Sequence, residues 1–136
     1  MDAQDMGDAL ERILVTEDEL SRRMRELAAQ VDADYQGKEL LLVGVLKGAL
    51  MVMADLSRNL HTPLAMDWMA VSSYGTGTKS SGVVRILKDL DADVHGRDVL
   101  IVEDIIDSGM TLSWLSENLL SRGAASVEIA AALRKT

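Results

Sequence analysis

The sequence predicts an α/β fold, with a mostly parallel sheet flanked by helices and a flexible antiparallel hairpin. Two apolar stretches, 40–45 and 99–102, have the composition of strands buried on both faces. Each is followed by a short turn with a glycine and then by a helical pattern, and this alternation is typical of parallel sheets. Two further strand patterns enclose a polar segment with three glycines, 72–82, and they predict the hairpin.

The composition limits the classes of protein to be considered. A chain of 136 residues can form one domain with one core, so we expect a single domain over 1–136. The net charge of −8 argues against nonspecific binding to nucleic acid, and the lack of cysteine excludes disulfides and thiolate metal sites. No signal peptide and no apolar run of membrane-spanning length are found, so we expect no membrane association and a cytoplasmic location.

A helix is predicted to begin at Thr16, because 16–19 forms a capping box with Glu19 three residues after the N-cap. Before it, 1–15 is acidic and mixed, with a brief strand at 13–15. The arginines 22, 23 and 25 lie mainly off the apolar face and are best interpreted as a solvated surface. The apolar face is formed by residues at helical spacing: Leu20, Met24, Leu27, Ala28 and Val31.

The first buried strand, 40–45, is followed by the turn Leu46-Lys47-Gly48 and by an apolar helix from Ala49 to about Leu60. Lys47 is a lone cation beside a glycine at the carboxyl end of a strand. Taken alone, it is an exposed turn lysine.

The predicted hairpin begins after a break at 61–63 and consists of strand 64–71, segment 72–82 and strand 83–88. The segment is either a plain flexible connection or a lid that closes over a site. The acidic turn 89–93 lacks the glycine and terminal glutamate of an EF-hand, which argues against calcium. Both histidines, at 61 and 95, lie in turns and are expected at the surface, whereas both tryptophans, at 68 and 114, are expected in the core.

The stretch 99–122 carries the chemistry. Glu103 and Asp104 follow the strand at its carboxyl end, where open α/β sheets bind ligands, and a predicted helix covers 112–122. The loop 108–111 between them offers backbone N–H groups, two hydroxyls, a glycine that permits close approach, and the N-terminus of the helix. These groups predict a phosphate site. Acids beside a phosphate are consistent if they face hydroxyl groups, a metal ion or a proton, and a sugar phosphate with a divalent cation provides all three. A last strand is predicted at 127–133.

The ten residues from Val102 to Thr111, Val-Glu-Asp-Ile-Ile-Asp-Ser-Gly-Met-Thr, resemble the signature with which type I phosphoribosyltransferases bind phosphoribosyl pyrophosphate (PRPP). The Glu-Asp pair with Asp-Ser-Gly further on resembles the 6-oxopurine branch, the hypoxanthine-guanine phosphoribosyltransferases. The resemblance implies a type I phosphoribosyltransferase fold and purine salvage: transfer of a phosphoribosyl group from PRPP to hypoxanthine or guanine, giving IMP or GMP and pyrophosphate, with Mg²⁺. It also implies a homodimer or homotetramer.

The resemblance assigns a role to each matching residue. Asp107 would accept the proton of the purine, although an Asp here could also be a helix N-cap. Glu103 and Asp104 would bind the ribose hydroxyls and hold Mg²⁺. The PRPP site as a whole would comprise Glu103, Asp104, Asp107, Ser108, Gly109, Met110 and Thr111.

Outside this signature the resemblance covers nearly the whole chain. Lys47 and Gly48 would bind pyrophosphate, in a loop where the peptide bond before the lysine can be cis, and Ser73 and Tyr74 would belong to a flexible loop over the site. Lys135 would contact the exocyclic oxygen of the purine, unless it is only a terminal residue.

In the family the chain continues beyond this lysine with a segment that supplies a purine-stacking aromatic ring, so we expect 1–136 to lack that segment. The alternatives are a pyrimidine or xanthine phosphoribosyltransferase and a non-catalytic PRPP-binding module.

Overall fold

The computed structural model describes residues 17–74, 83–106 and 109–134, and these form three helices and five strands. Four elements come first in the chain: α2 (Glu17–Asp34), β1 (Leu40–Val45), α3 (Leu50–Asn59) and β2 (Leu64–Tyr74). The hairpin strand and the second strand–helix–strand unit follow: β3 (Val83–Lys88), β4 (Asp98–Ile106), α4 (Met110–Ser121) and β5 (Ser126–Arg134). The predicted capping box at Thr16 and the brief strand at 13–15 lie outside the described residues.

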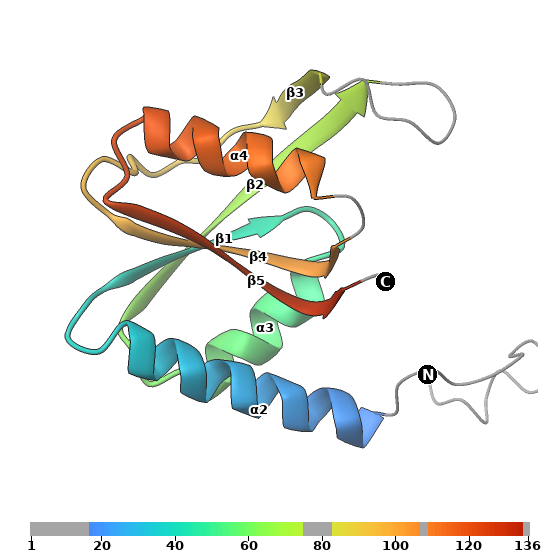
Figure 1. The fold of residues 1–136 in the computed structure, drawn as a ribbon, viewed down its shortest axis with the longest axis vertical. Helices are drawn as coiled ribbons and strands as arrows, with labels where there is room; N and C mark the ends of the chain where they lie inside the picture. The colour runs from blue at the N-terminus through green and yellow to red at the C-terminus, as the bar shows by residue number, and fades with distance from the viewer. Residues whose placement is uncertain (1–16, 75–82, 107–108, 135–136) are drawn as a thin grey trace, which may run out of the picture.

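The five strands form one sheet in the order β3-β2-β1-β4-β5. β1 lies between β2 and β4 and is parallel to both, and β5 is parallel to β4. Only β3 is antiparallel, paired with β2 from Ala70 to Tyr74. The predicted α/β fold with a mostly parallel sheet and an antiparallel hairpin is therefore confirmed (Figure 1).

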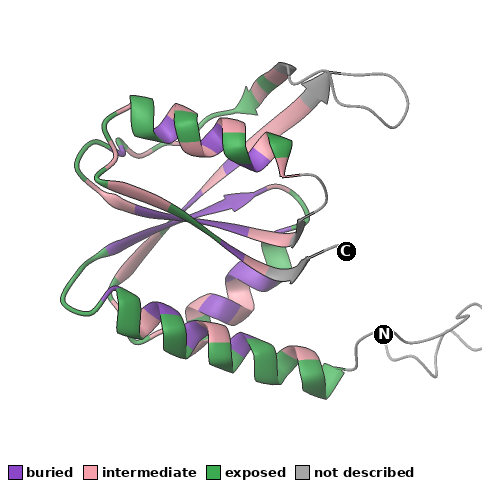
Figure 2. Ribbon diagram, in the orientation of Figure 1, coloured by how far each residue is buried: buried purple, intermediate pink, exposed green. Residues whose placement is uncertain are grey.

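The core has two halves, one on each face of the sheet (Figures 1 and 2). On one face, α2 and α3 pack on even-numbered residues of the central strands, such as Leu42 and Leu100. On the other face, α4 packs on odd-numbered residues, such as Val43 and Ile101. The alternation follows from the pleat of a strand, which directs successive side chains to opposite faces. Both tryptophans pack against these clusters but remain partly exposed, so the prediction of core positions is met only in part.

Two strands extend further than the sequence pattern predicts. β2 runs to Tyr74 instead of Val71, and β4 covers Asp98–Ile106 instead of 99–102. Glu103 and Asp104 therefore belong to β4 and do not follow it. The pairing of β4 with β5 continues through Glu103 to Ile106, because parallel hydrogen bonding does not depend on whether a side chain is apolar. Both histidines are exposed, as predicted.

Carboxylates hold the turns at the amino edge of the sheet. Asp32, in α2, accepts hydrogen bonds from the backbone N–H groups of His61 and Thr62 at 2.9–3.1 Å and from the Thr62 hydroxyl at 2.6 Å. Asp67, in β2, is only 5% exposed and accepts from the N–H groups of Trp68, Asp91 and Ala92 at 2.8–3.0 Å.

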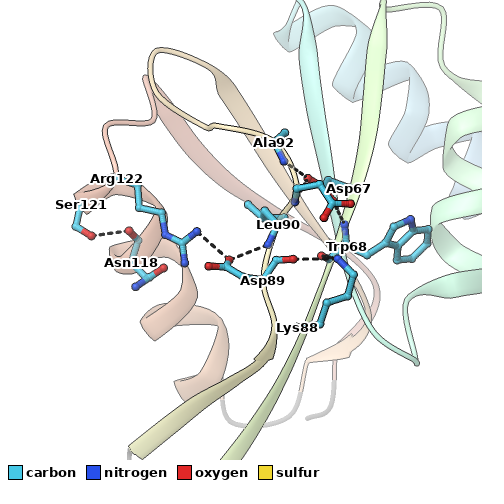
Figure 3. A network of polar contacts seen from close by, with 10 residues as sticks. Asp67, Trp68, Lys88, Asp89, Leu90, Ala92, Asn118, Ser121 and Arg122 are labelled. Carbon is cyan, nitrogen blue, oxygen red and sulfur yellow. Dashed lines mark hydrogen bonds and ion pairs between the residues drawn. The ribbon is translucent and has the colours of Figure 1, made fainter.

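The acidic turn before β4 is held in a second way, by an ion pair between Asp89 and Arg122 at 2.9 Å (Figure 3). The guanidinium of Arg122 lowers the pKa of Asp89 below its usual value. Arg122 directly follows α4, so the pair ties the end of that helix to the turn.

None of the described helices is long and apolar enough to cross a membrane.

Candidate active site at the carboxyl edge of the sheet

The middle of the sheet contains a topological switch point. From β1 the chain passes through α3 to β2 on one side, and from β4 it passes through α4 to β5 on the other. α3 and α4 cover opposite faces, so the two turns leave neighbouring parallel strands in opposite directions (Figure 1). Open α/β sheets bind ligands in the crevice outside the carboxyl ends of such strands. The candidate residues of both turns therefore meet where a ligand is expected.

The first turn connects β1 to α3 and contains the lysine and glycine singled out in the sequence. The Leu46–Lys47 peptide bond is cis, and Lys47 is exposed. Ala49 is the N-cap of α3 and makes no side-chain capping hydrogen bond, and the first turn of the helix has no acidic residue. The positive end of the helix dipole is therefore not offset by a carboxylate of the helix itself.

The second turn connects β4 to α4. Gly109 is the N-cap of α4, with φ 79° in the left-handed region, which glycine adopts without steric cost. The N-cap position is thus occupied by Gly109, whereas Asp107, the residue considered for that role, lies outside the described residues. As in α3, the first turn of α4 has no acidic residue and the N-cap has no side-chain hydrogen bond. The first turn of α2, by contrast, has three acids: Glu17, Asp18 and Glu19.

Glu103 and Asp104 place two carboxylates beside these helix N-termini. Oε1 of Glu103 accepts a hydrogen bond from the backbone N–H of Asp104 at 3.0 Å. Burial, together with the neighbouring Asp104 carboxyl, raises the pKa of Glu103 to about 7. Two close carboxyl groups resist simultaneous ionisation because their charges repel. A pKa raised in this way is typical of sites that bind a cation or hydrogen-bond donors.

The Asp104 carboxylate also lies directly against the first turn. A Cβ placed on Gly48 would be 2.8 Å and 2.9 Å from its two oxygens. Sequence reasoning assigned both residues to the site but missed this contact. No local signal could reveal it, because residues 48 and 104 become neighbours only through the pairing of β1 with β4.

The structure brings together one part of the predicted site and leaves another part undescribed. The residues gathered at the carboxyl edge are Lys47, Gly48, Glu103, Asp104, Gly109, Met110 and Thr111. Ser73 and Tyr74 are the last residues of β2, where they pair with Val84 and Val83. Asp107, Ser108 and Lys135 lie outside the described residues.

Two carboxylates with exposed turns beside them suit Mg²⁺ chemically. This hard cation prefers oxygen ligands, keeps several waters and is commonly held by one or two carboxylates together with phosphate oxygens. Among the residues that the structure describes, no group of three or more His, Cys, Asp or Glu side chains is placed to hold a metal alone. Glu103 and Asp104 fit a metal that shares its coordination with a substrate.

Fold and site together define an α/β domain with a candidate ligand site at a switch point. The comparisons with known proteins agree, since the phosphoribosyl transferase domain family matches residues 14–136. The chain belongs to this phosphoribosyltransferase family.

Curated relatives come from the 6-oxopurine branch. The chain is 52% identical over 132 residues to the hypoxanthine-guanine phosphoribosyltransferase of Mycobacterium tuberculosis, and this match covers 93% of the chain. It is 52% identical over 126 residues to that of Bacillus subtilis, a match that covers 93% of this chain and 70% of the relative. The chain spans 65% of the length of the mycobacterial relative.

The solved structures that resemble this chain are also hypoxanthine phosphoribosyltransferases. A hypoxanthine phosphoribosyltransferase from Staphylococcus aureus superposes with a TM-score of 0.92 at 46% identity, covering 96% of this chain and 71% of the other. The enzyme from Trypanosoma cruzi in complex with the product IMP superposes with a TM-score of 0.85 at 40% identity, covering 94% and 73%.

Proposed function

We propose that this chain binds PRPP with Mg²⁺ and transfers the phosphoribosyl group to hypoxanthine or guanine. The observation that carries the proposal is the meeting of two turns at the switch point, one with Lys47 and Gly48 and the other with Gly109 at a helix N-terminus. Together with the carboxylates of Glu103 and Asp104, they offer separate positions for pyrophosphate, phosphate and ribose. The T. cruzi relative, which binds IMP, supports the choice of product.

In the proposed reaction, the bond between C1′ of the ribose and the pyrophosphate oxygen breaks, and a bond from C1′ to a purine ring nitrogen forms. Pyrophosphate leaves with the electron pair of the broken bond, bound by Lys47 and the N–H of Gly48. Asp107 accepts the proton that the purine loses. Backbone N–H groups and hydroxyls of 108–111 hold the 5′-phosphate, so the sugar remains fixed while positive charge develops at C1′.

Glu103 and Asp104 would hold Mg²⁺ and the ribose hydroxyls. Bound there, the metal would partly neutralise the pyrophosphate and so make it a better leaving group. Lys135 would donate to the exocyclic oxygen of the base. A lysine can only donate, so it favours a 6-oxo over a 6-amino purine. Ser73 and Tyr74, at the end of β2, would lead into a segment that covers the site and excludes water.

The first test is pyrophosphate release from PRPP by the 136-residue chain with Mg²⁺ and either hypoxanthine or guanine. Release that depends on one of these bases is the expected result. Saturable PRPP binding by calorimetry without release would overturn the transfer reaction and leave a PRPP-binding module. Release that occurs only with xanthine or a pyrimidine would overturn the assignment of the base.

Lys47 provides a sharper test, because it is exposed and contributes little to folding. A charge-assisted contact contributes about 1.5–3 kcal/mol, so Lys47→Met should weaken PRPP and pyrophosphate binding at least tenfold. Lys38→Met is the matched control, since Lys38 is also exposed and precedes the other end of β1. Equal affinities in the two variants would remove Lys47 from the site.

We also propose that the chain forms a homodimer or homotetramer. Leu50, Met51 and Met66 are 53%, 69% and 52% exposed. Leu50 and Met66 line a mainly apolar hollow of about 230 Å³ between α3 and β2, together with Trp68. Apolar surface of this kind typically marks an interface. Sedimentation should give the mass of a dimer or tetramer, and Met51→Lys should shift it toward the monomer; a monomeric parent chain would contradict the proposal.

A further inference from the structure

Gly48 lacks the usual reason for a glycine in a turn. The described glycines with positive φ are Gly37, Gly96, Gly109 and Gly123, with φ between 72° and 93°, and Gly48 is not among them. Its backbone therefore has a conformation that other residues can adopt. Any restriction on the residue at position 48 must therefore come from the space around it.

That space is occupied by a carboxylate from another strand. A Cβ on Gly48 would lie 2.8 Å from Oδ2, 2.9 Å from Oδ1 and 3.0 Å from Cγ of Asp104. Carbon–oxygen contacts this short are repulsive, so any side chain at 48 would displace the Asp104 carboxylate or the turn. At Gly109 the situation is the reverse, since φ is positive and no atom of the described residues lies within 4 Å of a Cβ there.

The sheet register explains why these two residues meet. β1 pairs with β4 in parallel up to Gly44 and Val102, so Asp104 lies beyond the last paired residue and beside the turn that follows β1. Asp104 is on the same face of β4 as Leu100 and Val102, which is the face that α3 covers. Its side chain thus extends toward the beginning of α3, where Gly48 lies.

We propose that Gly48 is a positioning residue: the side chain it lacks leaves the space that holds the Asp104 carboxylate against the turn 46–49. The consequence for binding rests on the proposed function. Asp104 would face the ribose, and Lys47 and Gly48 would face the pyrophosphate of the same PRPP molecule. The contact fixes the distance between these two parts of the site before the ligand arrives, and such preorganisation lowers the cost of binding.

A double-mutant cycle tests the proposal with the parent chain, Gly48→Ala, Asp104→Ala and the double variant. In the parent, Gly48→Ala should weaken PRPP binding roughly tenfold, because displacement of a ligand-binding group by a fraction of an ångström is costly. In the Asp104→Ala background, where the obstructing oxygens are gone, the same substitution should change affinity less than twofold. Calorimetry with PRPP and Mg²⁺ measures all four affinities.

The same cycle is followed without ligand by urea unfolding. Gly48→Ala should lower the unfolding midpoint of the parent but not that of Asp104→Ala. Gly37→Ala is the control, because Gly37 precedes β1 and nothing lies within 4 Å of a Cβ there. Its effect comes from positive φ alone and should be equal in both backgrounds.

The two readouts separate failure of this inference from failure of the proposed function. Equal effects of Gly48→Ala in both backgrounds, in unfolding and in binding, would overturn the positioning role. A parent chain that does not bind PRPP would overturn the proposed function, while the unfolding cycle would still decide whether Gly48 makes room for Asp104.

Discussion

Carboxylates at the two edges of the sheet have opposite surroundings. At the amino edge, Asp67 accepts hydrogen bonds from three backbone N–H groups, and Asp32 accepts hydrogen bonds from His61 and Thr62. At the carboxyl edge, Glu103 and Asp104 are neighbours of like charge, and burial beside Asp104 raises the pKa of Glu103 to about 7. The first arrangement stabilises the fold. The second costs stability and is therefore expected where ligands or a cation complete the site.

The largest expected effect is at the carboxyl edge. Asp107→Asn should lower turnover between 10²- and 10⁴-fold, the range for loss of a general base, while PRPP binding stays largely intact. Steady-state pyrophosphate release and calorimetry measure the two quantities. Asp98→Asn, at the other end of β4, is the control and should leave turnover unchanged. Equal turnover in the Asp107 variant and the parent would remove Asp107 from the mechanism.

At the amino edge the expected effect is on stability. Asp67→Ala leaves three N–H groups without their acceptor, and each such loss costs about 1–3 kcal/mol when the group is buried. We expect a loss of about 3 kcal/mol in the free energy of unfolding, measured in urea, with normal PRPP affinity in the folded fraction. Asp91→Ala, an exposed residue in the same turn, should cost much less. A loss below 1 kcal/mol at Asp67 would show that water replaces the carboxylate.

Glu103→Gln tests whether the carboxyl edge is destabilised by its charges. The change removes one of two close acids, so at pH 8 the free energy of unfolding should rise, by no more than about 1 kcal/mol because the group is only half-buried. PRPP affinity should fall at the same time. Glu117→Gln, on the exposed face of α4, should change neither quantity. Lower stability in the Glu103 variant would contradict the interpretation that neighbouring charges destabilise the carboxyl edge.

The smallest effect is expected at Asp32 and depends on pH. Burial raises the pKa of this carboxyl, but the hydrogen bonds from Thr62 and His61 lower it more, so the net pKa is below the ordinary 3.8. A carboxyl with a lowered pKa stabilises the fold above its ordinary pKa, and this contribution is lost as the pH falls through the lower value.

Between pH 6 and pH 3, the parent should therefore lose more unfolding free energy than Asp32→Asn, by less than about 1 kcal/mol because the carboxyl is partly exposed. Urea unfolding at the two pH values measures the difference, with Asp34→Asn as the control. An identical pH dependence in the parent and the Asp32 variant would show that these hydrogen bonds do not favour the charged form.

Local sequence patterns determined much of this protein. The apolar run of β1, the glycine after it and the apolar spacing of α3 predict strand, turn and helix, because each depends on residues close in the chain. The same holds for β4, Gly109 and α4, and the repetition of this unit is enough to predict a parallel sheet. The ten-residue signature from Val102 to Thr111 was sufficient to indicate the family.

Tertiary structure alone decided how the carboxylates are used. In the sequence, Asp67 is only a polar residue within a strand pattern, and no local signal names its partners; in the structure it is buried and accepts hydrogen bonds from the N–H groups of Asp91 and Ala92, more than twenty residues away. Gly48 likewise looks like an ordinary turn glycine until the pairing of β1 with β4 brings Asp104 against it. Helical and strand periodicity depend on neighbours in the chain, whereas these contacts depend on the order of strands in the sheet.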